Sequence, residues 1–119
     1  MSVPRPRLSA RKCKDLPAGT KPMTAAAIAR LLPEVPGWEH RGGRLRREFL
    51  FGDFHQTMAF VNAVAWIAHA EDHHPDLGVK FNRCDVTYNT HSIRGISMND
   101  FICAAKINSL LDDAPAQRR

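Results

Sequence analysis

The 119-residue sequence has few cysteines and no paired set of them. Cys13, Cys84 and Cys103 form no C-x-x-C pair, and three cysteines leave one over from any disulfide. Reduced thiols of this kind are typical of a cytosolic protein, so the sequence predicts a cytoplasmic location without a disulfide framework. We expect Cys84 and Cys103 to pack as small apolar residues.

Long apolar runs are also missing. The longest apolar-leaning stretch, residues 58–70, is interrupted by Asn62 and contains His69, so no membrane span is expected. The basic residues near the amino terminus are not followed by an apolar segment of the signal-peptide type. Hydrophobic residues make up 44% of the chain and charged residues 24%, which fits a globular protein with one domain.

Large apolar side chains are scarce in residues 1–22, which hold four prolines and one glycine. Such a segment cannot offset the entropy of ordering by burying its own side chains, so it is predicted to be a flexible basic arm. Residues 113–119 are predicted to be a flexible tail. The net charge of +5 is concentrated in these flanks, but they lack interleaved aromatic residues and any nucleic-acid-binding motif. We therefore assign the charge to solubility and expect no nucleic-acid partner.

Residues 23–112 have the periodicities of a folded domain. An apolar stripe of helical period, which includes Phe54 and Val61, marks a central helix, and Gly42-Gly43 favours a tight hairpin. The predicted elements are a helix over 25–32, strands over 38–40 and 45–51, a helix from 54 to 72–74, strands over 77–81 and 84–88, and a last helix after Ser97. This order, α-β-β-α-β-β-α, describes a two-layer α+β domain: a four-stranded antiparallel sheet with the helices packed on one face.

Three histidines form the candidate site. His73 and His74 stand directly before Pro75, and His91 follows eighteen residues after His73. Pro75 disfavours helical geometry at the residue before it, so the histidine pair lies where the central helix ends, whereas His91 lies at the end of the fourth strand. Both are rigid supports from which imidazoles can reach one concavity. Imidazole titrates near pH 6.5, about neutrality, so these residues can donate and accept protons without a cofactor.

Other interpretations of these histidines stay open. His73 could cap the carboxyl end of the helix, His74 could fix the turn through a backbone carbonyl, and His91 could be an exposed loop residue. A metal site is a second alternative, because His69 and His73 stand at i and i+4; the further ligands would be His74, His91 or Asp72. Adjacent histidines diverge and no H-E-x-x-H signature is present, which favours acid-base chemistry. A regulatory or dimerisation module without turnover is a third alternative.

The segment Asp72-His73-His74-Pro75, together with the later Asn89-Thr90-His91, resembles the signature of the pterin-4a-carbinolamine dehydratases. The resemblance extends over residues 38–110 and also includes Gly37-Trp38, Phe60, Gly95 and Asp100. It implies dehydration of a 4a-hydroxytetrahydropterin to quinonoid dihydropterin and water, the recycling step that follows an aromatic amino-acid hydroxylase. It implies no metal and no organic cofactor.

By the same resemblance, His73 and His91 form the acid-base pair and His74 orients the substrate. Asp72, Asn89 and Thr90 would line the pocket. A homodimer or homotetramer, joined through sheet edges or helices, is implied as well. The sequence departs from many relatives at four positions. It has His69 where they have Glu, Leu77 where they have Trp, Phe81 where they have Tyr, and Asn89 where they have Ser.

Overall fold

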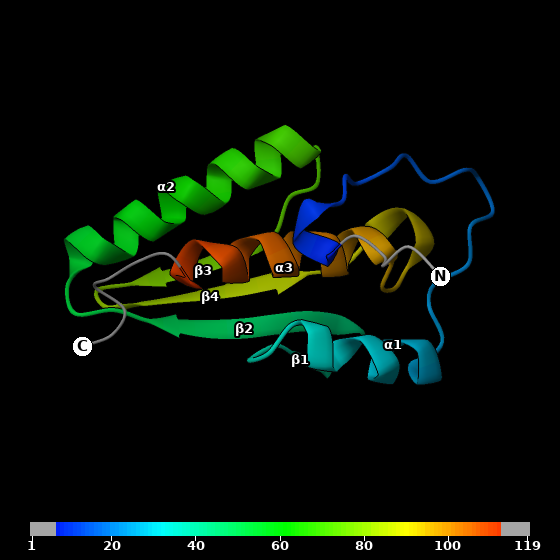
Figure 1. Ribbon diagram of the computed structural model, residues 1–119, viewed down its shortest axis with the longest axis horizontal. Coiled ribbons are helices and arrows are strands. Elements are labelled where there is room, and N and C mark those ends of the chain that lie inside the picture. The colour runs from blue at the N-terminus through cyan, green and yellow to red at the C-terminus, as the bar shows by residue number, and fades with distance from the viewer. Residues whose placement is uncertain (1–6, 113–119) are drawn as a thin grey trace, which may run out of the picture.

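The computed structural model describes residues 7–112, which form a four-stranded antiparallel sheet with α-helices on one face (Figure 1). The predicted α+β class and element order are confirmed. The elements are α1 (Ala25–Leu31), β1 (Glu39–Arg41), β2 (Arg44–Leu50), α2 (Phe54–Glu71), β3 (Asp76–Lys80), β4 (Arg83–Tyr88) and α3 (Met98–Asp112), with 3-10 helices η1 (Leu8–Ala10), η2 (Leu32–Glu34) and η3 (His91–Ile93). None of the helices in residues 7–112 has the length and apolar composition needed to cross a membrane.

The strands lie in the order β1-β2-β4-β3, so β2 and β4 form the centre of the sheet. Their register pairs Leu45 with Tyr88 and Phe49 with Cys84, and these four side chains are buried beneath the helices. β1 and β2 are joined at the two glycines predicted to turn, which have φ angles of +59° and +73°. These left-handed angles suit glycine because it has no Cβ. The turn therefore sets the register of the first hairpin.

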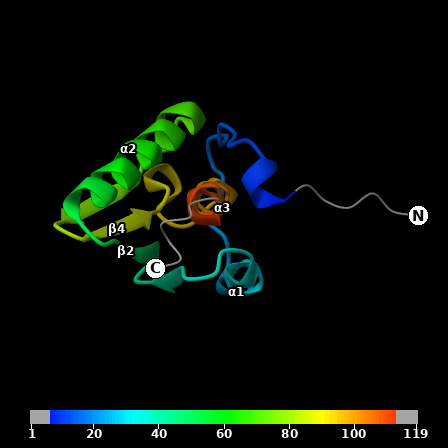
Figure 2. The same cartoon turned by 60° about the vertical axis from the view of Figure 1, so that its left-hand side comes forward.

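α3 is the central helix of the second layer and lies between α2 and α1 in Figure 2. Its first half is buried almost all round, from Asn99 to Ala105. α2 buries one side of the predicted apolar stripe, which also included Phe60, Val64 and Ala68: these three residues are buried, whereas Phe54 is half exposed. Because α2 is apolar on most of its circumference, its periodicity alone does not fix which side faces the core.

Residues 7–22, which we call the N-terminal strap, lie against α3 and the end of α2, although their composition predicts a flexible arm. Leu8 is buried in the core. Lys14 and Asn99 exchange two hydrogen bonds, with Lys14 N donating to Asn99 Oδ1 at 3.0 Å and Asn99 Nδ2 donating to Lys14 O at 2.8 Å. The strap is thus held mainly by polar groups of other elements, which its own composition does not reveal. The domain boundary at residue 22 stays a prediction, and the predicted tail, 113–119, lies outside the described residues.

Candidate active site

α2 is followed by a left-handed residue, Asp72, that turns the chain toward the sheet. Asp72 has φ 51° and ψ 43°, and the N–H groups of Asp72 and His73 donate to the carbonyls of His69 and Ala68. This arrangement satisfies the last carbonyls of α2, as in a Schellman ending. Asp is one of the few residues other than glycine that adopts this conformation at low cost. His73 consequently leaves the helical face and points to α3.

His73 is paired with a buried carboxylate. Its Nε2 atom lies 2.6 Å from Oδ1 of Asp100, a fully buried residue in the first turn of α3. The other carboxylate oxygen, Oδ2, accepts hydrogen bonds from Thr90 Oγ1 at 2.8 Å and from Ser97 N at 2.9 Å. Asp100 therefore caps α3 and holds His73 at the same time. The sequence has no local signal for its contact with His73.

The pair changes the protonation of the imidazole. Burial acts to lower the pKa of His73, but the hydrogen bond to Asp100 and its negative charge outweigh burial and raise the pKa above the ordinary value of 6.5. An imidazole that donates from Nε2 to a carboxylate has only Nδ1 left for another molecule. His73 is thus oriented by its partner, with one nitrogen available.

Tyr88, the last residue of β4, supports the same histidine from the sheet. The Tyr88 and His73 rings are stacked, with centroids 5.1 Å apart and planes inclined by 24°. The Tyr88 hydroxyl donates a hydrogen bond to the backbone carbonyl of His73 at 3.2 Å. Since Tyr88 is fully buried, it fixes both the ring and the backbone of His73.

The remaining predicted residues differ in their burial. Thr90 is buried, and its hydroxyl is shared between Asp100 and Ser97 Oγ at 2.7 Å. Asn89 is partly buried, whereas Asp72, His74 and His91 are exposed. Within residues 7–112, these three exposed side chains make no hydrogen bond, so their polar atoms are open to a ligand. The structure therefore joins His73 to Thr90 through Asp100 and leaves His74 and His91 at the surface.

The geometry of α2 does not support the alternative metal site. It required His69 and His73 on one helical face, but α2 ends at Glu71 and the left-handed Asp72 separates the two histidines. The Nε2 atom of His73 is directed to Asp100. In the part of the chain that the structure describes, no group of three or more His, Cys, Asp or Glu side chains is arranged to hold a metal ion.

Residues 21–110 match the model of a protein family described as Pterin 4 alpha carbinolamine dehydratase. A relative from Nitrosospira multiformis, named "Putative pterin-4-alpha-carbinolamine dehydratase", is 50% identical over 103 residues, which cover 87% of this chain and 91% of the relative. The crystal structure of a transcriptional coactivator/pterin dehydratase from Brucella melitensis is similar with a TM-score of 0.73 and 32% identity, over 76% of this chain and 98% of that one. The structure of a pterin dehydratase-like protein, a RuBisCO assembly factor in the alpha-carboxysome, shares the fold with a TM-score of 0.55. It is 23% identical, and the match covers 62% of this chain and 88% of that chain.

Proposed function

The chain belongs to the pterin 4 alpha carbinolamine dehydratase family, and we propose that it converts a 4a-hydroxytetrahydropterin into quinonoid dihydropterin and water by histidine acid-base catalysis. The observation that carries the catalytic part of the proposal is the hydrogen bond from His73 to the buried Asp100. It orients an imidazole and raises its pKa at the end of α2. A fixed proton donor is what the reaction needs.

The reaction requires little beyond proton transfer. The lone pair of N5 expels the hydroxyl group from C4a, so the protein has to protonate the departing oxygen and accept a proton from the ring. General acid-base catalysis contributes about 10²- to 10⁴-fold to such a step. In our proposal Nδ1 of His73 protonates the leaving oxygen, because Asp100 occupies Nε2 and raises the pKa of the ring.

We assign roles to the other predicted site residues according to the exposure of their side chains. His91 serves as the second acid-base group, and His74 orients the pterin, since both side chains are exposed. Asp72 and Asn89 contact the substrate. Thr90 acts as a positioning residue, because its hydroxyl is bound to Asp100 and Ser97.

We further propose that the substrate comes from a hydroxylase of aromatic amino acids and that the protein is a homo-oligomer. Family membership supports the first point. For the second, the edge strand β3 and the turn after it expose Val79 by 40% and Phe81 by 65%, and the outer side of α2 exposes Trp66 by 71%. Exposed apolar groups on an edge strand favour association with another chain.

A direct dehydration assay tests the proposed function. Freshly generated 4a-hydroxytetrahydropterin is mixed with the full-length protein, and formation of the quinonoid product is followed by its absorbance. We expect acceleration over the spontaneous reaction, with a loss of roughly 100-fold in His73→Ala and His91→Ala. His55→Ala is the matched control, because His55 is exposed in the first turn of α2. Full turnover in both site variants, with unchanged circular dichroism, would refute the acid-base assignment.

A further inference from the structure

Two thiols far apart in the sequence face each other between the N-terminal strap and α3. Cys13 Sγ lies 3.6 Å from Cys103 Sγ, and the two residues are 90 positions apart. A disulfide has an S–S distance of about 2.05 Å, so the sulfurs have to approach by only about 1.5 Å. Cys103 lies on a buried helix, whereas Cys13 lies on a part of the strap without regular secondary structure.

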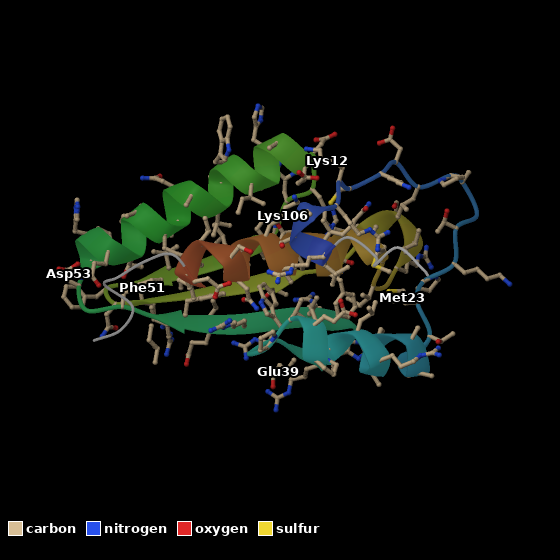
Figure 3. All side chains as sticks on the ribbon, viewed as in Figure 1. Lys12, Met23, Glu39, Phe51, Asp53 and Lys106 are labelled. Atoms are coloured by element: carbon tan, nitrogen blue, oxygen red, sulfur yellow. The ribbon has the colours of Figure 1, made fainter. Side chains whose placement is uncertain are left out.

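The strap is anchored on both sides of Cys13. Lys12 Nζ and Cys13 N both donate to the carboxylate of Glu71, each at 2.8 Å. The Glu71 side chain is only 4% exposed, and it also lies 3.7 Å from Lys106 Nζ. Figure 3 shows Lys12 and Lys106 converging from the strap and from α3 near the end of α2. On the other side of Cys13, Lys14 is paired with Asn99. The Cys13 thiol is therefore held beside Cys103.

The two sulfurs also differ in acidity. The hydrogen bond from the Cys13 thiol lowers the pKa of Cys103, and burial only partly opposes it. The same hydrogen bond, together with burial, raises the pKa of Cys13. A thiolate is the reactive form in oxidation and exchange. Cys84 lacks such a partner among residues 7–112, and burial raises its pKa to about 11, so it stays an unreactive thiol.

We propose that Cys13 and Cys103 form an oxidative modification site, a dithiol that a peroxide-class oxidant converts into an intramolecular disulfide. Hydrogen peroxide oxidises one sulfur to a sulfenic acid and releases one water. The other sulfur then attacks the sulfenic sulfur, forms the S–S bond and displaces a second water. Two thiols and one hydrogen peroxide thus yield one disulfide and two waters, and two electrons pass from the sulfurs to the peroxide.

The bond would fasten the strap to the helix that carries the candidate site. Cys103 follows Asp100 by one helical turn, and Cys13 adjoins the strap residue that is paired with Asn99. The closed loop would contain the whole sheet and α2, and long loops are the ones whose closure restricts the unfolded chain most. A reductant such as a small thiol reverses the bond. This proposal is independent of the dehydratase reaction.

The test uses the full-length, reduced protein and hydrogen peroxide at a small molar excess, followed by alkylation and peptide mapping without reductant. We expect a mass loss of two hydrogens, a linked peptide joining Cys13 to Cys103, and Cys84 alkylated only after unfolding. The melting temperature should rise by roughly 10 °C and return after treatment with dithiothreitol.

Two variants separate this bond from other oxidation products. Cys84→Ala removes the third thiol and should behave as the natural protein. Cys13→Ser keeps the backbone hydrogen bonds of the strap, and should yield neither the linked peptide nor the peroxide-dependent rise in melting temperature. Sulfinic or sulfonic acid at Cys103 with an unmodified Cys13, or disulfides only between separate chains, would overturn the proposal.

Discussion

At the scale of single residues, one carboxylate connects the folding of α3 to the protonation of the candidate site. Asp100 uses Oδ2 to cap the helix and to bind Thr90, and Oδ1 to bind His73. A fully buried carboxylate is costly unless hydrogen bonds and an opposite charge compensate it, and His73 supplies that charge when it is protonated. The folded structure therefore favours the protonated form of His73.

A pH-dependent stability follows from this pair. Because the folded-state pKa of His73 is raised, the stability from His73 is fully present below the unfolded pKa of about 6.5 and is lost as pH rises through the folded pKa. We expect the melting temperature to fall as pH rises above about 6.5, and to fall by more in the natural protein than in Asp100→Asn, which keeps the shape of the side chain without its charge. Thermal unfolding between about pH 6 and pH 9 measures both slopes. Parallel curves would show that Asp100 does not set the titration.

At the scale of elements, the sequence predicts the helices and strands but not every contact between them. The local periodicity of the sequence identified β2 and β4, and Pro75 placed the end of α2 at residues 72–74, close to its observed end at Glu71, because both signals are local. The contact of His73 with Asp100 joins residues 27 positions apart and depends on how α2 packs against α3, for which the sequence has no local signal. The catalytic assignments of His73, His74 and His91 stay predictions.

The ending of α2 offers a test at this scale. Asp72 has a left-handed conformation, in which a β-branched side chain costs about 1–2 kcal/mol and glycine none. Asp72→Val should therefore lower the free energy of unfolding by about 1–2 kcal/mol, whereas Asp72→Gly should leave it nearly unchanged. Denaturant titration distinguishes the two. Equal stability of the variants would mean that the ending of α2 rearranges without cost and that the position of His73 is not fixed by it.

At the scale of the whole molecule, the N-terminal strap connects the parts of the structure that form the candidate site. It begins at η1 against α3, passes the end of α2 and reaches α1, where Met23 N donates to Ile96 O at 2.8 Å (Figure 1). A Cβ atom at Gly95 would lie 2.5 Å from Cβ of Pro22, so only glycine lets the strap approach the loop after His91 so closely. The strap thus contacts both the loop and the helix that hold Thr90 and Asp100.

Removal of the strap should consequently destabilise the domain, even though its composition is that of a flexible arm. Deletion of residues 1–20 removes the buried Leu8 and the hydrogen bonds to Glu71 and Asn99, and we expect the melting temperature to fall by roughly 10 °C. Leu8→Ala removes only the buried side chain, and it should lower the free energy of unfolding by about 2 kcal/mol. This loss should account for a large part of the effect of the deletion. Asp15→Ala, at an exposed strap position, is the control and should change nothing. An unchanged melting temperature in the deletion variant would show that residues 7–20 do not contribute to the fold, and that the boundary near residue 22 predicted from composition is the physical one.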